Sequence, residues 1–280
     1  MSFLDNLFGT DYIKLLQRYC QSSIRINIGG EAGVEIGVSH FGGKPDVPDD
    51  FVWPVYKNMP LVFLAQLSCA ELAPYDINHE LPETGLLSFF YALDNECYGY
   101  ENRDVAGFRV FWFDGETALH THEFVVGIPE KHMLPRIGIS FTREATYPHC
   151  EDFTVLTESN IEDYNKFEAA EQELGIHRTD LMHRTLGWAD LIQNNSTWHC
   201  ELLSQGYSFG SEFMKIPEQI RSGSKLPSVH RWKLLLQLGT VREGDFTLMF
   251  GDAGKLYFYI PEEDLKSRRF DRVCGEMQCY

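Results

Sequence analysis

Six short runs of aliphatic and aromatic residues constrain the fold of this chain more than any other feature. Each run is bounded by Gly, Pro, Asp or Asn, which is the pattern of β-strands separated by turns. Several runs are apolar at every position, which indicates burial on both faces or a closed β architecture. We therefore expect a mainly β fold (β-rich α+β) with roll-like sheets and a few peripheral helices. The expected strands are residues 61–67, 86–91, 108–113, 123–127, 232–238 and 256–260.

The length of 280 residues allows one large β-rich domain or two smaller modules. Because 44% of the residues are hydrophobic, the chain can bury a large core, which excludes disorder as its main state. We expect a single domain over residues 1–280, with possible pseudo-duplicated halves at 23–150 and 181–280. Residues 151–180 contain nine acidic and two basic residues and are interpreted as an acidic helical connector between the halves.

The chain is strongly acidic, since 24 basic and 41 acidic residues give a formal net charge of −17. Such a surface repels phosphate backbones, so nucleic acid is not an expected partner. No apolar run reaches the ~18 residues of a membrane-spanning helix, and residues 1–5 lack the pattern of a signal peptide. The seven cysteines are odd in number, widely spaced and without a CxxC motif. We therefore expect a cytoplasmic protein with reduced thiols and no membrane partner.

Two segments show the three- and four-residue apolar spacing of helices. In the connector we expect a helix with Asn160 as its N-cap and Gly175 as its stop. A third, short helix is expected to begin at Pro261, because acidic and then basic residues follow it as the helix dipole favours. The N-terminal helix is expected to be capped by Thr10. Its apolar stripe would consist of Leu4, Leu7, Phe8, Tyr12, Leu15, Leu16 and Tyr19, and that of the connector of Ile161, Tyr164, Phe167 and Leu174.

A sequence echo connects the two halves. LAQL at 64–67 resembles LLQL at 235–238, and each is followed at similar spacing by a glycine, Gly85 or Gly254, and an aromatic strand. The echo suggests two related β units, although short aromatic strands also resemble one another by chance. A glutamine in an apolar strand must satisfy its buried amide. Gln66 and Gln237 therefore either bond to the backbone of a neighbouring loop or contact a ligand.

Several segments match elements of one known family in the same order. GGKP at 42–45 with Pro48 and Trp53-Pro54 is similar to a GGxPxxPxxxxWP signature, and PLVFLAQL at 60–67 and LPETGLLSFFY at 81–91 are similar to two further elements. LLLQL at 234–238, GDAGKLYFYI at 251–260 and the ending QCY are similar to closing elements. In this combination the chain, from about residue 40 to its end, resembles the YwqG-like family, a bacterial domain of unknown function.

The resemblance implies a mostly β, roll-like domain with added helices. It implies no established activity, and it supplies no catalytic residues to carry over. Members occur in bacterial gene neighbourhoods that include toxin–immunity systems, so the resemblance is compatible with an immunity or interaction protein.

The signature itself has a structural and a functional interpretation. Gly42 and Gly43 permit positive φ in a tight turn, and the prolines stiffen the segment that follows. Trp53 could plug one end of a sheet, or the same segment could form a ligand loop. It is not a phosphate loop, because neither GKS/GKT nor a helical pattern follows.

Evidence for catalysis in the sequence is weak. No GxSxG, HExxH, dinucleotide fingerprint or P-loop occurs. His120 and His122 would share one face of a strand and are weak candidates for metal ligands, but a site needs a third ligand and a polar strand face is the simpler interpretation. The adjacent pairs His149-Cys150 and His199-Cys200 indicate nothing, since catalytic pairs meet in space. No cofactor is expected, and whether the chain is an enzyme is left open, with the absence of motifs favouring a non-enzyme.

Two functions remain as hypotheses. The first is a non-enzymatic, cytoplasmic interaction protein, for example an immunity-type protein, whose acidic surface binds a basic protein partner. The second is an enzyme or small-ligand-binding protein with a cleft between the two β halves. In the segment 187–193, the mixture of aromatic and polar groups suits such a cleft, although a core tryptophan is the simpler interpretation. The candidate ligand-binding residues are Trp53, Gln66, Trp188, Gln193, Gln237 and Asp252.

Overall fold

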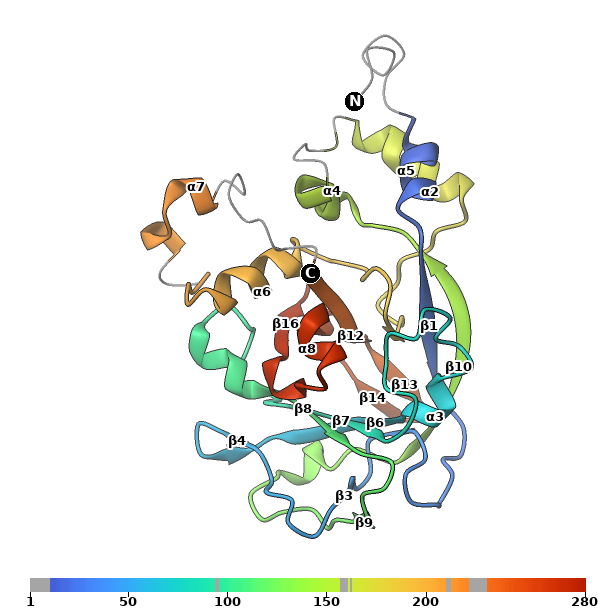
Figure 1. Cartoon of the computed structure of the whole chain (residues 1–280), viewed down its shortest axis with the longest axis vertical. Coiled ribbons are helices and arrows are strands. Elements are labelled where there is room, and N and C mark those ends of the chain that lie inside the picture. The colour runs from blue at the N-terminus through green and yellow to red at the C-terminus, as the bar shows by residue number, and fades with distance from the viewer. Residues whose placement is uncertain (1–10, 94–95, 157–160, 162, 210–212, 222–230) are drawn as a thin grey trace.

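A ten-stranded antiparallel sheet dominates the computed structural model, which describes residues 11–93, 96–156, 161, 163–209, 213–221 and 231–280 (Figure 1). The mainly β fold expected from the sequence is confirmed. The strand order is β16-β15-β12-β11-β1-β10-β2-β6-β7-β8. These strands span, in chain order, β1 Gln21–Ile28, β2 His40–Phe41, β6 Val62–Ser68, β7 Leu86–Tyr91, β8 Phe108–Phe113, β10 Ile137–Thr146, β11 Arg184–Thr185, β12 Trp232–Leu238, β15 Lys255–Pro261 and β16 Cys274–Gln278.

Three small two-stranded sheets and several short helices complete the described structure. The small sheets are β3–β9 (Asp46–Val47 with His120–Thr121), β4–β5 (Val55–Tyr56 with Met59–Pro60) and β13–β14 (Val241–Glu243 with Phe246–Leu248). The α-helices are α2 Tyr12–Arg18, α3 Cys69–Leu72, α4 Cys150–Leu156, α5 Tyr164–Glu173, α6 Ser196–Ser204, α7 Glu218–Arg221 and α8 Glu262–Lys266. The 3₁₀ turns are η1 Asn102–Gly107, η2 Glu130–His132, η3 Phe213–Lys215 and η5 Phe270–Arg272. None of these described helices has the length and apolar character needed to cross a membrane.

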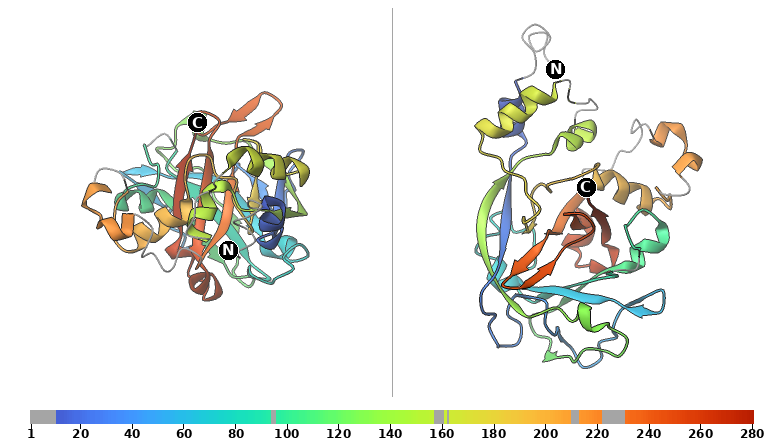
Figure 2. Two further views of the ribbon diagram at one scale, coloured as in Figure 1. Left: turned by 90° about the horizontal axis from the view of Figure 1, so that it is seen from above. Right: turned by 180° about the vertical axis from the view of Figure 1, so that it is seen from behind.

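The sheet has a central ribbon, β1 with β10, and two four-stranded arms. The first arm is β2, β6, β7 and β8, and the second arm is β11, β12, β15 and β16. β1 and β10 pair from Gln21 opposite Thr146 to Ile28 opposite Ile139. β10 joins the first arm through β2, and β1 joins the second arm through β11. Helices α2, α4 and α5 gather at one end of this ribbon (Figures 1 and 2).

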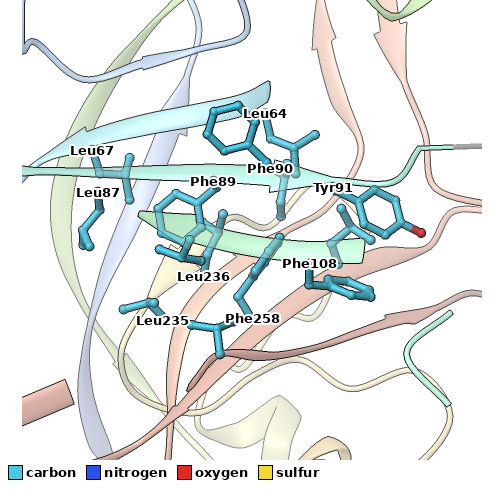
Figure 3. Packing of buried hydrophobic residues seen from close by; sticks show 14 of the residues in the cluster. Leu64, Leu67, Leu87, Phe89, Phe90, Tyr91, Phe108, Leu235, Leu236 and Phe258 are labelled. Carbon is cyan, nitrogen blue, oxygen red and sulfur yellow. The ribbon is translucent and has the colours of Figure 1, made fainter. Parts of the chain in front are cut away.

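The main core lies where the two arms face each other. Phe89 of β7 and Phe108 of β8 both pack edge-to-face on Phe258 of β15, each with ring centroids 5.5 Å apart (Figure 3). Such pairs contribute about 0.5–1.5 kcal/mol beyond the area they bury. Because these strands come from opposite ends of the strand order, the contacts show that the sheet curls into a nearly closed roll. This explains why β7 and β15 are buried at every position.

Most expected elements are confirmed, with informative differences. Residues 123–127 are not a strand; the strand is His120–Thr121, which pairs with Asp46–Val47. The helix caps also differ: the carboxylates of Asp11 and Asp163 accept from the backbone N–H groups of Lys14 and Lys166 and begin α2 and α5. Gly175 follows α5 with φ +67°, as expected of a helix stop. The expected positions Leu4, Leu7, Phe8, Thr10 and Asn160 lie outside the described residues.

The two arms have matching registers. Both contain a register shift directly before the glutamine, between Phe63 and Ala65 in β6 and between Leu234 and Leu236 in β12. The first strands also correspond, because His40 lies opposite Gln66 and Arg184 lies opposite Gln237. The boundaries at 23–150 and 181–280 stay a prediction, but the pairing itself is equivalent in the two arms.

Candidate functional site

Gln66 and Gln237 each fix an aspartate loop by the same three hydrogen bonds. Gln237 Oε1 accepts from the backbone N–H of Asp190 at 2.7 Å, and its Nε2 donates to Met182 O at 3.0 Å and to Asp190 Oδ2 at 3.3 Å. In the first arm, Gln66 Oε1 accepts from the N–H of Asp46 at 2.9 Å. Its Nε2 donates to Val38 O at 2.9 Å and to Asp46 Oδ2 at 2.7 Å. Both glutamines are fully buried, so these amides hold the loops in place.

The loops themselves adopt matching conformations. Gly42 and Gly43 have φ of +58° and +68°, and Leu186 and Gly187 have φ of +62° and +66°. The turn expected from the glycine pair is therefore confirmed, and the second arm builds the same turn with a leucine in its first position. We call each arrangement of glutamine, aspartate and carbonyl an aspartate lock.

The second aspartate lock carries a concentration of charge that the first lacks. Arg178 Nη1 and Arg184 Nη1 each donate to Asp190 Oδ1 at 3.0 Å. Lys255 Nζ donates to the main-chain oxygen of Asp190 at 3.1 Å and lies 4.0 Å from its Oδ2. Asp46 is held instead by neutral donors, since it accepts from the N–H of Gly37 at 2.9 Å and from the Thr121 hydroxyl at 2.8 Å.

Burial and charge act in opposite directions in this group. Burial alone would raise the pKa of Asp190, but Arg184, Arg178 and Lys255 hold it below its usual range. Burial lowers the pKa of Lys255 to about 8 although Asp190 opposes the shift. Burial also acts to lower the pKa of Arg178, yet Asp190 and Glu171 raise it. Asp190 is therefore a fixed anion that holds three cations together.

A pocket of about 270 Å³ opens beside this cluster. Three arginines and two carboxylates line it, together with an apolar rim formed by Leu174, Ile176 and Met182. Its walls come from β1, β10, the connector and β11, so it lies between the central ribbon and the second arm. The lining residues are Arg25, Glu144, Ala145, Thr146, Tyr147, Leu174, Gly175, Ile176, His177, Arg178, Met182, Arg184 and Asp190.

Glu144 is the second carboxylate of this arginine pocket. Its Oε1 lies 2.9 Å from Arg184 Nε, and its Oε2 lies 3.8 Å from Arg25 Nη1. Burial raises the pKa of Glu144, and the two arginines oppose that shift. Arg178 is occupied differently, because it also bonds to Glu171 and to the main-chain oxygens of Tyr147 and Pro148. Arg178 thus fastens the connector to the sheet.

The six ligand-binding candidates from the sequence do not converge on this pocket. Gln237 and Trp188 lie next to it: Gln237 holds Asp190, and Trp188 accepts from Arg184 through its main-chain oxygen at 3.1 Å. The Trp188 indole donates to Tyr19 O at 2.6 Å. Both residues support the pocket without lining it, and their roles as ligand contacts stay predictions.

The other four candidates lie elsewhere. Gln66 belongs to the first aspartate lock. Trp53 is half-buried, donates to Leu61 O at 2.9 Å and packs on the rings of the first arm, as a scaffold residue would. Gln193 is exposed and accepts from the Tyr100 hydroxyl at 3.2 Å. Asp252 is exposed in the turn before β15. A single cleft built from all six residues is therefore not what the fold forms.

His120 and His122 lie near each other but have other neighbours. Their ring centroids are 6.3 Å apart. His120 faces the carboxylate of Asp49 at 3.1 Å, and His122 packs against Trp53 with ring centroids 5.5 Å apart. Within the described part of the chain, no group of three or more His, Cys, Asp or Glu side chains could hold a metal ion.

The His149–Cys150 pair is close but lacks the charge state of a catalytic pair. Cys150 Sγ lies 3.4 Å from His149 Nδ1. Burial raises the pKa of the thiol to about 11 and lowers the pKa of the imidazole to about 3. At neutral pH both groups are uncharged, whereas a nucleophilic cysteine needs its thiolate. In the other adjacent pair, His199 and Cys200, the imidazole is held by a carboxylate, because His199 Nδ1 contacts Glu276 Oε1 at 2.7 Å.

Reasoning from the sequence alone missed the arginine pocket. Arg25, Glu144, Arg178 and Arg184 belong to separate segments, and only strand pairing brings them together. The alternation of polar and apolar residues in β1 and β10 was the available signal for the strands, since it predicts which side chains share a face.

Comparison with known protein families identifies the family of this chain. The profile of Domain of unknown function (DUF1963) matches residues 39–279. The chain belongs to this family. Both arms, both glutamines and both aspartates of the locks of this DUF1963 protein lie within the match, whereas Val38 and β1 with Arg25 precede it. No curated protein matches the chain.

Proposed function

We propose that this DUF1963 protein binds a small anionic molecule in the arginine pocket. The observation that carries the proposal is the contrast between the two aspartate locks. In matching registers, His40 replaces Arg184, and Gly138 opposite His40 replaces Arg25 opposite Arg184. The first residue of β7 is Leu86, where β15 has Lys255. The first arm therefore builds the same lock without arginines, so the lock itself does not require them.

Electrostatics support the same proposal. On a chain with a formal net charge of −17, three arginines facing two carboxylates form a local site for an anion. Arginine presents its donors in a fork that suits oxyanions, and partial burial strengthens these bonds relative to open water. The volume of about 270 Å³ suits a ligand of metabolite size.

Direct binding measurements test this function. Calorimetric titrations with inorganic phosphate, sulfate, glutarate and hexanoate should find at least one anion that binds with a Kd below about 1 mM. Arg25→Gln should weaken this binding about tenfold, because it removes a charged donor at the pocket rim. Arg143→Gln is the matched control, since Arg143 is exposed on β10 and does not line the pocket. Failure of every anion to bind would contradict the proposal.

A second function rests on the acidic surface. We propose that the protein is cytoplasmic and also binds a basic protein partner, as an immunity-type protein would. Exposed carboxylates support this, among them Asp49 and Asp50 beside β3 and Glu168 and Glu173 on α5. Pull-downs from cell extract at low salt should recover a basic protein whose binding weakens with added salt. Recovery of no protein partner would remove this function.

The matching arms support a proposed origin. We infer that they descend from one duplicated β unit, and we assign the YwqG-like name within the family on the sequence elements quoted above. The exchange of first strands supports a duplication, because β1 precedes the first arm in the chain but pairs with the second, while β10 precedes the second arm and pairs with the first. Both arms should then superpose with their aspartate locks aligned, and failure to superpose would contradict the duplication.

A further inference from the structure

Glu144 already places a carboxylate between two arginines of the pocket. It extends from β10 toward Arg184 of β11 and Arg25 of β1, at the 2.9 Å and 3.8 Å distances given above. The longer distance exceeds a hydrogen bond, so Arg25 is attracted to Glu144 without being bound tightly by it. The position between these two guanidinium groups is therefore shaped and charged for one carboxylate.

The donors of the other cationic groups are engaged within the protein. Arg178 donates to two carboxylates and two main-chain oxygens. Arg184 Nη1 donates to Trp188 O and to Asp190. The Nε side of Arg184 and the guanidinium of Arg25 are what the pocket offers to an incoming anion, and Glu144 covers both.

Glu144 and Asp190 differ in how firmly they are held. Asp190 is locked by Gln237 and contacts three cations, so its departure would leave buried charges unpaired. The Glu144 side chain retains 18% of its exposure and makes one close ionic contact. Of the two carboxylates in the pocket, Glu144 is the one that can turn toward solvent without unpairing the core.

We propose that Glu144 is an internal substitute for the ligand, and that the ligand is a small monocarboxylic acid whose carboxylate takes its place between Arg184 and Arg25. The rest of the ligand would lie against the apolar rim formed by Leu174, Ile176 and Met182. This inference rests on the proposed anion-binding function and names its ligand class. Exchange of one carboxylate for another keeps the charge of the arginine cluster balanced while Glu144 moves into water.

Calorimetric titration of the wild type and Glu144→Gln with hexanoate and with inorganic phosphate tests this exchange. Glu144→Gln should bind hexanoate about tenfold more tightly than the wild type, because the internal competitor has lost its charge. Phosphate should bind more weakly than hexanoate to both proteins. Glu173→Gln, an exposed change of equal charge on α5, should behave as the wild type, which separates local competition from net charge.

The possible failures are distinct. Unchanged or weaker hexanoate binding by Glu144→Gln would overturn the exchange, while anion binding itself would stand. Tighter binding of phosphate than of hexanoate would overturn the carboxylate class. Absence of hexanoate binding to both proteins would overturn this inference, and the proposed function would fall with it only if phosphate, sulfate and glutarate also fail to bind the wild type. Thermal unfolding of each variant confirms that the compared proteins are folded.

Discussion

Arg184 occupies in the second arm the place that His40 occupies in the first: each begins a short strand and lies opposite the glutamine of an aspartate lock. Both locks contain the glutamine, but only the second lock is surrounded by charged groups. The glutamine therefore belongs to the structure that both arms share, and the charged groups belong to the arginine pocket. The first arm is therefore an internal reference for the second.

Gln66→Leu and Gln237→Leu should destabilise the protein by similar amounts. Each change leaves a buried aspartate N–H and a main-chain oxygen without their amide partner, which costs about 1–3 kcal/mol. Urea unfolding of the two variants measures the loss. Gln193→Leu is the control, because Gln193 is exposed and its replacement should change stability by less than about 0.5 kcal/mol. A large difference between the two buried sites would show that the locks are not equivalent in energy.

Asp190→Asn should be more destabilising than Asp46→Asn. Removing the charge of Asp190 leaves Arg178, Arg184 and Lys255 without their shared anion, and breaking a buried ion pair costs about 3–5 kcal/mol. Asp46 accepts from neutral donors, so its replacement should cost about 1–3 kcal/mol. The two free energies of unfolding can be compared directly in urea. Equal losses of unfolding free energy would mean that water solvates Arg178, Arg184 and Lys255 once the charge of Asp190 is removed.

Much of the fold was predictable because its strands are continuous apolar runs. The expected runs at 86–91, 108–113 and 232–238 coincide with β7, β8 and β12. The central ribbon was not expected, because β1 and β10 alternate polar and apolar residues and lack such runs. A strand was expected at residues 123–127 because they contain the apolar Val125 and Val126, but no described strand pairs with them.

The site was less predictable for a related reason. Gln66 and Gln237 stood out because an amide in an apolar strand needs a partner, and that argument is local. Arg25 and Glu144 acquire meaning only through the register of β1 with β10, and Arg184 only through the register of β11 with β1. Such pairings are distant in sequence, so periodicity cannot indicate which charged side chains will share a pocket.

The buried His183 should lower the free energy of unfolding under mildly acidic conditions. Burial lowers its pKa to about 4, and its Nδ1 accepts from the N–H of Gly239 at 3.1 Å, which requires the neutral ring. Between pH 6.5 and 4 the unfolded chain therefore binds a proton that the folded chain does not. The free energy of unfolding should fall with decreasing pH in this window, by up to about 1.4 kcal/mol per pH unit from this group.

Urea unfolding at several pH values between 4 and 7 measures the contribution of His183. His183→Gln should reduce the slope of unfolding free energy against pH relative to the wild type. Part of the slope should remain, because burial also lowers the pKa values of His40 and His149. His177→Gln is the control, because His177 is exposed and should leave the slope unchanged. An unaltered slope in His183→Gln would contradict the assignment.

Gly187→Ala should destabilise the second aspartate lock more than Gly175→Ala destabilises the end of α5. Both glycines have left-handed backbones, with φ of +66° and +67°, so both substitutions carry the same conformational cost of about 1–2 kcal/mol. They differ in space: a Cβ at Gly187 would lie 2.3 Å from Thr146 Oγ1 and 2.7 Å from Ser23 Cβ, whereas a Cβ at Gly175 meets nothing within 4 Å. The loop would have to move away from the central ribbon, and Asp190 would move with it. Thermal and urea unfolding should show the larger loss for Gly187→Ala, and anion binding should weaken in that variant because Asp190 moves. Equal losses would mean that the ribbon yields to the methyl group and that the position of Asp190 does not depend on this contact.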